Sequence, residues 1–228
     1  MKYLIILGDG MADYRCADLG NKTPLQYALK PNMDFVAGRG VMGLVRTVAP
    51  GMTPGSDVAN LSVMGYDPAL YYTGRAPLEA VSMGVQLGER DVAFRCNLVT
   101  LEGDGQYRNK TMADYSAGEI ASDRAAVLIK DLADHLKSSD MKFYPGVSYR
   151  HLMVWSGGPA DTLLTPPHDI SGKAVGQYLP GGGEAQSLLA VMVESNRFLQ
   201  EHPLNSPSAG HKPANSVWFW GQGKTPSI

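Results

Sequence analysis

The chain has 228 residues, of which 44% are apolar and 18% charged, and its formal net charge is −2. These values are typical of a soluble globular protein and leave room for one large domain or two smaller ones. The basic residues are scattered along the chain, so the charge pattern predicts no nucleic-acid partner. Two cysteines, Cys16 and Cys96, cannot form a disulfide framework and are typical of a reducing compartment.

The N-terminal apolar run is too short for a signal peptide or a membrane span, so we expect a cytoplasmic protein with no membrane partner. The run covers residues 3–7 and ends at Gly8-Asp9-Gly10. Such a run is typical of a strand buried on both faces of a parallel sheet. Because open α/β sheets bind ligands at the carboxyl ends of their strands, Asp9 is a candidate ligand, or else a solvated turn residue.

Helix and strand patterns then alternate, as an α/β fold requires. Helical spacing over residues 22–40 is interrupted by Pro31, and residues 42–48 have the pattern of a second strand. Ser56 follows a Pro-Gly turn and has two interpretations. It is the N-cap of a helix over 57–64, or a nucleophile in the positive field of the helix N-terminus, where a phosphate would also bind.

The pattern changes near Gly88 and predicts a second, α+β unit from there to the end of the chain. Residues 92–102 alternate between apolar and polar side chains and end at a Gly-Asp-Gly turn, which is typical of a half-buried strand. The other expected elements are strands over 149–157 and 216–223, a helix over 185–200, a proline-stiffened loop over 164–172 and a polar loop over 202–215.

The clearest helix pattern covers residues 116–139. Ser116 and Glu119 have the spacing of a capping box and place the expected helix start at Ser116. Apolar residues recur on one face at helical spacing, namely Ala125, Leu128, Ile129, Leu132 and Leu136.

Several long segments, taken in chain order, resemble the archaeal type of cofactor-independent phosphoglycerate mutases, which belong to the alkaline phosphatase superfamily. They are LGDGMADY, KTPLQYA, PNMDFVA, GSDVANLSVMGYDP, YYTGRAPLEA, VAFRCNLVT, ADYSAG, FYPGVSYRHL, TPPHDI, HPLN and WFWGQG. The resemblance covers essentially the whole chain. It implies that residues 1–87 are the N-terminal part of an alkaline-phosphatase-like catalytic domain with a parallel sheet, and that residues 88–228 are an inserted substrate-binding domain.

The resemblance also implies a function. Members of the family are isomerases that interconvert the small molecules 3-phosphoglycerate and 2-phosphoglycerate through a phosphoserine intermediate. Ser56 matches the serine that accepts the phosphoryl group, and Asp9 matches a metal-ligating aspartate. Two divalent metal ions, Mn or Zn and possibly Mg, would activate Ser56, which is itself a ligand.

Candidate substrate-binding residues lie in the second unit. Arg150 is suited to bind a carboxylate or phosphate through two hydrogen bonds, and His151 lies beside it. Arg95 and Asn97 lie on an expected strand, where one of them could belong to the solvated face.

Further candidates lie on loops. Asp169, beside His168 on the Pro-Pro loop, could move protons between the two glycerate hydroxyls, although His168 could equally bond to the backbone of its loop. Asp114 belongs to the segment ADYSAGEI, in which the family more commonly has His at the position of Glu119. Because a glutamate would repel phosphate, this departure leaves the exact substrate open.

Other polar residues also have two interpretations. Asp57 and Asn60 could support the site, but Asp57 is equally a favourable acid in the first turn of a helix. Arg75 could neutralise phosphate or pair with a carboxylate. Lys212 and Lys224 are expected to be solvated.

The length of the chain leads to a further expectation. Family members are much longer, and their second half supplies the remaining metal ligands and completes the sheet. We therefore expect a fragment without the C-terminal half of the catalytic domain, which binds no catalytic metal, is inactive alone and self-associates through an uncovered sheet edge. Two alternatives remain open: a related phosphotransferase similar to homoserine kinase, and a non-catalytic module that binds a phosphorylated acid.

Overall fold

The computed structural model describes residues 2–182, 184–206 and 211–226. The chain forms two compact units, Met1–Arg46 and Thr47–Ile228. The second unit holds the sheet together with residues 47–87, which precede it in the chain. The functional domain boundary expected near residue 88 therefore does not coincide with this division, and it stays a prediction.

The first unit contains only short helices among its described residues. The expected interruption at Pro31 is confirmed, because one helix ends before it and the next begins there. The three are a 3₁₀ helix, η1 (Ala17–Leu19), and two α-helices, α1 (Pro24–Tyr27) and α2 (Pro31–Ala37).

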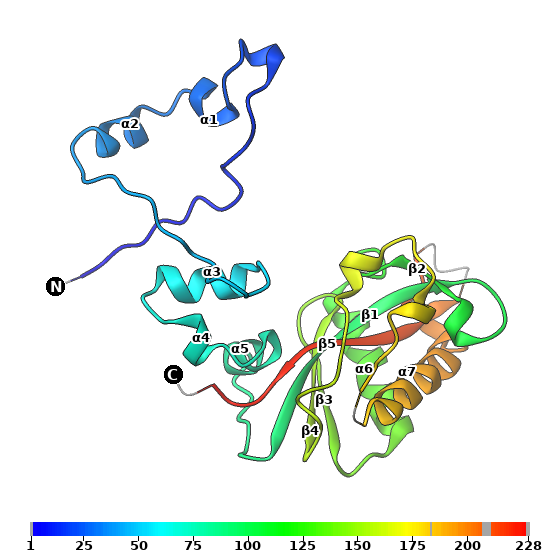
Figure 1. Cartoon of the computed structure of the whole chain (residues 1–228). Coiled ribbons are helices and arrows are strands. Elements are labelled where there is room, and N and C mark those ends of the chain that lie inside the picture. Colours follow the sequence, from blue (N-terminus) through cyan, green and yellow to red (C-terminus); the bar gives the residue numbers. More distant parts are fainter. Residues whose placement is uncertain (1, 183, 207–210, 227–228) are drawn as a thin grey trace. The chain divides into compact units, whose positions relative to one another are not determined.

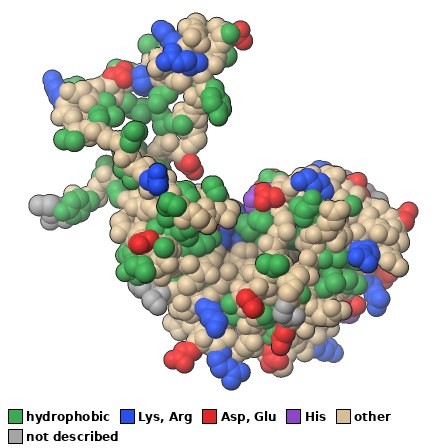
Figure 2. All heavy atoms as spheres, in the orientation of Figure 1, with side chains coloured by type: hydrophobic (Ala, Val, Ile, Leu, Met, Phe, Trp, Pro, Cys, Tyr) green, Lys and Arg blue, Asp and Glu red, His purple; other side chains and the backbone are tan. Residues whose placement is uncertain are grey.

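The prediction of a parallel sheet in the N-terminal part of the chain is wrong. Neither residues 3–10 nor residues 42–48 form a strand. Their apolar side chains lie at the surface, where the exposed fraction is 85% for Leu4 and 105% for Leu44, and Figure 2 shows such apolar side chains in green. A parallel strand needs neighbouring strands and covered faces, and described residues 2–46 give these two segments no partner strand.

The second unit confirms the α/β class but with an antiparallel sheet (Figure 1). Its central strand is β1 (Asp91–Glu102), which pairs with β4 (Arg150–Ser156) and with β5 (Ser216–Gly223). β3 (Met141–Tyr144) pairs with β4, and β2 (Thr111–Asp114) pairs with the end of β1. The three longer strands confirm the predicted ones, whereas the two four-residue strands are too short for an alternating pattern to show.

Helices cover both faces of this sheet. On one face α6 (Ser122–Leu136) and α7 (Ala185–Gln200) share a core with Phe94 and Cys96 of β1. On the other face α5 (Arg75–Ser82) packs against Ala93. Shorter helices complete the unit: α3 (Ser56–Val63), α4 (Pro68–Tyr71), η2 (Tyr107–Asn109), η3 (Pro167–Ile170), η4 (Val175–Gln177) and η5 (Pro203–Asn205).

The helix predicted over 116–139 is confirmed in its apolar face but not in its start. It begins at Ser122, and the Ser116 hydroxyl accepts a hydrogen bond from the Glu119 amide at 3.3 Å within a preceding turn. Asp114 organises that turn, because its carboxylate accepts from both the amide and the hydroxyl of Ser116. The buried residues of the face are Ala125, Leu128, Ile129 and Leu132, with Leu136 packed against the core. The helix predicted over 185–200 is confirmed with both of its ends.

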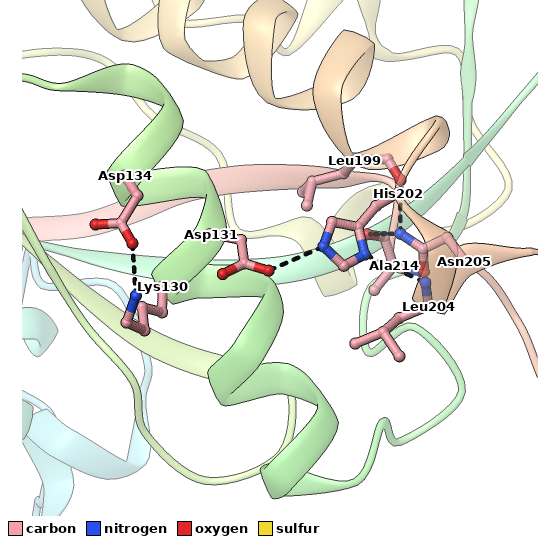
Figure 3. A network of polar contacts seen from close by, with 8 residues as sticks. All are labelled: Lys130, Asp131, Asp134, Leu199, His202, Leu204, Asn205 and Ala214. Carbon is pink, nitrogen blue, oxygen red and sulfur yellow. Dashed lines mark hydrogen bonds and ion pairs between the residues drawn. The ribbon is translucent and has the colours of Figure 1, made fainter.

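Asn205 ties the end of α7 to the segment that leads into β5 (Figure 3). Its side-chain amide donates to the carbonyl of Leu199 at 2.7 Å and to the carbonyl of Ala214 at 3.0 Å. Its side-chain oxygen accepts from the Ala214 amide at 2.9 Å. The polar loop expected over 202–215 is therefore held at both ends, although residues 207–210 lie outside the described residues.

We predict that Asn205→Asp destabilises the protein. The substitution keeps the shape but places a carboxylate against two carbonyl oxygens, so the free energy of unfolding should fall by about 3 kcal/mol at pH 7. Urea unfolding measures the change. Asn109→Asp, at an exposed position in η2, is the control and should change the free energy of unfolding by less than about 0.5 kcal/mol. Equal losses in the two variants would contradict the role of Asn205.

Candidate active site

Ser56 is the first residue of α3, and the N-cap is Gly55, which forms no side-chain capping bond. The interpretation of Ser56 as an N-cap is therefore wrong. Asp57 bonds to the backbone of the first turn instead, since its Oδ1 accepts from the Val58 amide at 3.0 Å. The exposed Ser56 hydroxyl is thus placed at the positive end of the helix without being part of its cap.

Ser56 lines a hollow of about 530 Å³, which we call the Ser56 hollow. Its main feature is a set of three arginines from three elements: Arg75 of α5, Arg95 of β1 and Arg150 of β4. Figure 2 shows the second unit hollowed on the side drawn. The full lining is Ser56, Asp57, Asn60, Arg75, Leu78, Glu79, Ser82, Met83, Arg95, Gly146, Val147 and Arg150.

Arg95 is the buried cation of this hollow, with 4% of its surface exposed. Its Nη1 lies 2.7 Å from Oε2 of Glu79, while its Nε has no hydrogen-bond partner among the described residues. Burial lowers the pKa of Arg95, the Glu79 carboxylate raises it, and the charges of Arg75 and Arg150 lower it further. A buried donor without an acceptor, beside two more cations, favours binding of an anion.

A second hollow of about 440 Å³, the His168 hollow, shares Asp57 and Arg75 with the first. His168 and Asp169 line it from the Pro-Pro loop, with 3.7 Å between His168 Nε2 and Asp169 Oδ1. Tyr72 also lines it. The structure therefore brings both loop candidates to a hollow that shares two lining residues, Asp57 and Arg75, with the Ser56 hollow.

Tyr72 links α4 to the start of α3. Its hydroxyl donates to Oδ2 of Asp57 at 2.5 Å. Burial, and after it this hydrogen bond, raises the pKa of Tyr72, so the hydroxyl stays protonated and the bond persists across the neutral range. Asp57 is consequently both a first-turn acid and a support of the site.

Asp114 and Glu119 lie elsewhere. Asp114 forms an ion pair with Lys212, at 2.7 Å from Nζ to Oδ2, and lines neither hollow. Partial burial would raise the pKa of Asp114, but hydrogen bonds from Lys212 and Ser116 outweigh it and lower the pKa to about 2. Glu119 lines a separate hollow that also contains Lys212, so it adds no negative charge to the Ser56 hollow. Lys224 is exposed.

His151 lies on the opposite face of the sheet from Arg150, because successive side chains of a strand alternate. It is fully buried, and its Nδ1 accepts from the Gly146 amide at 3.0 Å. Burial lowers the pKa of His151 to about 3. The structure does not bring His151 into either hollow, so its expected contact with substrate has no support from the geometry.

We predict that His151 makes stability depend on pH. Between the unfolded pKa of about 6.5 and the folded pKa of about 3, the unfolded chain binds a proton that the folded chain does not. The free energy of unfolding therefore falls as the pH is lowered, by about 1.4 kcal/mol per unit. In His151→Asn the Asn Oδ1 replaces Nδ1 as the acceptor and nothing titrates.

Urea unfolding at pH 7 and pH 5 tests this dependence. Wild type should lose about 2 kcal/mol more than His151→Asn over this interval. The same loss in both proteins would show that His151 is not buried in its neutral form.

Asp9 lies in the first unit, in the turn after the N-terminal apolar run, and its side chain is exposed. Among the described residues, no three His, Cys, Asp or Glu side chains form a group that could hold a metal ion. Asp9 offers a carboxylate and Ser56 a hydroxyl as metal ligands. These two groups alone do not complete a metal site.

Three residues that line the two hollows were not predicted from the sequence: Tyr72, Glu79 and Trp220. Glu79 follows Arg75 by four residues, a spacing that places both on one face of a helix such as α5, but no helix was predicted there. Trp220 was hidden in an apolar strand pattern, and nothing local distinguishes it from a core residue. Tyr72 carries no signal that sequence reasoning could have used.

In the part of the chain that the structure describes, no helix has the length and apolar character to cross a membrane.

Residues 37–205 match the family model described as 2,3-bisphosphoglycerate-independent phosphoglycerate mutase. A protein of that name from Methanosarcina barkeri is 51% identical over 100% of this chain and 56% of its own length. One from Methanothrix thermoacetophila is 53% identical, again over 100% of this chain and 56% of its own length. The chain thus spans a little over half the length of these relatives.

Two solved structures are similar to this chain in fold. A protein from Pyrococcus horikoshii has a TM-score of 0.68 at 26% identity, over 96% of this chain and 50% of its own. A cofactor-independent phosphoglycerate mutase from Thermoplasma acidophilum has a TM-score of 0.50 at 29% identity, over 96% of this chain and 58% of its own.

Proposed function

The chain belongs to the family of 2,3-bisphosphoglycerate-independent phosphoglycerate mutases, as its motifs predicted, and on this premise we propose that it carries the phosphoryl-accepting part of a cytoplasmic mutase. The enzyme would interconvert 3-phosphoglycerate and 2-phosphoglycerate. The observation that carries the proposal is the Ser56 hollow, where an uncapped serine at a helix start shares one space with three arginines.

The proposed reaction has two transfers. Ser56 Oγ attacks the phosphorus of 3-phosphoglycerate, the bond from phosphorus to the C3 oxygen breaks, and the serine proton leaves as the C3 hydroxyl regains one. The C2 hydroxyl of glycerate then attacks the phosphoserine phosphorus and loses its proton. The bond from phosphorus to Ser56 Oγ breaks, and the serine oxygen takes up a proton. The net reaction moves the phosphoryl group without any other reactant.

The arginines would hold the anionic substrate. Arg95 lines the hollow with its Nη1 paired to Glu79, and Arg150 lines it as an exposed residue with no ion pair among the described residues. Arginine binds phosphate and carboxylate through parallel hydrogen bonds, so one arginine can orient the carboxylate while another holds the phosphate. Arg75, which lines both hollows, is placed to neutralise the transferred group.

Asp169 and His168 would move protons between the glycerate hydroxyls from the adjoining His168 hollow. The support is their place beside Arg75 and Asp57, which line both hollows.

Two divalent ions, Mn or Zn or possibly Mg, would lower the pKa of the Ser56 hydroxyl and neutralise phosphoryl oxygens in the complete enzyme. The described residues supply only Asp9 and Ser56 as proposed ligands and fit no complete metal site.

The kinase-like alternative rests on Glu119, the one departure that favoured another substrate, and its side chain lines a different hollow from that of Ser56. Burial, and after it the Glu119 carboxylate, raises the pKa of Tyr149, whose ring lies 5.7 Å from Cζ of Arg150. Glu119 therefore acts on a neighbour of the Ser56 hollow, and the alternative stays a second proposal.

We predict that Ser56→Ala abolishes mutase activity in a protein that contains this chain and is active. Loss of a covalent nucleophile should lower kcat by about 1000-fold or more. Ser62→Ala is the matched control on the same helix: its hydroxyl donates to the Val58 carbonyl, it lines neither hollow, and activity should stay within about twofold. Residual activity above a few per cent in Ser56→Ala would rule out the assignment.

We also predict that a polypeptide of these 228 residues, produced alone, is inactive, retains no catalytic metal and self-associates. The exposed apolar runs over 3–7 and 41–45 offer surface for association, and the described residues lack a metal-binding group. Metal analysis, a coupled mutase assay and light scattering check the three parts. A monomer with stoichiometric Mn or Zn and measurable turnover would contradict all of them.

A further inference from the structure

We propose that Trp220 is a positioning residue, which holds Arg75 and Arg95 in the orientation that receives a phosphate group. The inference rests on the proposed function for the identity of the ligand. The positioning role itself is inferred from the distances between the indole and its neighbours.

The indole of Trp220 contacts two guanidinium groups from different elements. The Cζ of Arg95, on β1, lies 4.7 Å from the ring centroid, and the Cζ of Arg75, at the start of α5, lies 5.4 Å from it. Cations are attracted to the negative face of an aromatic ring, most strongly to that of tryptophan. One ring thus brings together two like charges that would otherwise repel each other.

The ring itself is held in place. Trp220 is 6% exposed, and its Nε1 donates to Oδ1 of Asn97 at 3.0 Å. Asn97 in turn donates to the carbonyl of Tyr115 at 3.2 Å. His168 packs against the indole edge to face, with 5.3 Å between centroids. The indole therefore provides a rigid surface for the two arginines, and together with Arg75 it lines the His168 hollow.

Gly221 leaves room for the stem of Arg75. Its φ is +61°, in the left-handed region that favours glycine. A Cβ at this position would lie 3.3 Å from Cβ of Arg75 and 3.7 Å from Cδ of Arg95. A Cβ here would be in ordinary contact with Arg95 but would crowd the stem of Arg75, so Gly221 leaves the space in which Arg75 packs.

Stacking fixes a guanidinium by its face and leaves the N–H groups in its plane free for hydrogen bonds. Glu79 bonds Nη1 of Arg95, but Arg75 has no ion pair among the described residues. For Arg75 the indole is thus the main restraint. Without it, Arg75 would have to be ordered when the ligand binds, which weakens binding.

Trp220→Leu and Trp220→Phe, in the active protein, test the inference. The phosphate carries similar charge before and during transfer, so losing the ring should raise KM for 3-phosphoglycerate and Kd for inorganic phosphate by about tenfold, with kcat within about threefold. Phe keeps an aromatic face and loses the N–H, so its KM and Kd should stay within about threefold of wild type.

Trp218→Leu is the matched control. Trp218 lies on the same strand, is as deeply buried, and donates its Nε1 to the Thr165 carbonyl, but no arginine is recorded over its ring among the described residues. A KM change equal to that of Trp220→Leu would reduce Trp220 to a packing residue and contradict the inference.

Fluorinated tryptophan keeps the inference testable if the leucine variants do not fold. In a Trp155→Phe, Trp218→Phe background, increasing fluorination weakens the ring's negative face with little change of shape. Kd for phosphate should rise stepwise with fluorination, and an unchanged Kd would overturn the inference. A wild-type protein that binds phosphate but has no mutase activity would contradict the proposed function instead, and leave Kd to decide the role of Trp220.

Discussion

The buried charge of Arg95 is the constraint on which the site depends. A guanidinium that is 4% exposed must be compensated, and Glu79 and the ring of Trp220 compensate part of it. Its Nε is also buried and has no hydrogen-bond partner among the described residues, and Arg75 and Arg150 line the same hollow. The same burial that makes the charge costly makes its attraction for an anion strong, because little water screens it.

The two faces of the antiparallel sheet give neighbouring residues of one strand different surroundings. On β1 the side chains of Phe94 and Cys96 belong to the core shared with α6 and α7, while Arg95 and Asn97 point to the other side. The same alternation separates His151 from Arg150 on β4. Adjacent residues of a strand therefore lie on opposite faces of the sheet. This is why Arg150 lines the Ser56 hollow whereas His151 is buried.

The apolar residues of the first unit present a contrasting case. Leu4 and Leu44 lie in segments with the composition of buried strands, yet they are exposed in this unit. The composition of a segment shows that its side chains are suited to burial. A strand, however, forms only where a neighbouring strand accepts and donates its backbone hydrogen bonds. The α/β class was thus predicted correctly from local patterns, but the sheet that the structure contains is antiparallel and lies in the other half of the chain.

The sequence by itself determined the elements whose signal is local: the apolar face of α6, both ends of α7, and strands β1, β4 and β5. It also identified Ser56 and the arginines as candidates, because a motif needs no knowledge of contacts. Only the tertiary structure decided which of them share a space, that Asp114 pairs with Lys212, and that Trp220 lies against two guanidiniums. The contacts of Trp220 with the two arginines join residues more than a hundred positions apart, and packing of α5 and β5 on β1 creates them. The periodicity of side chains within one segment cannot predict a contact with a distant segment.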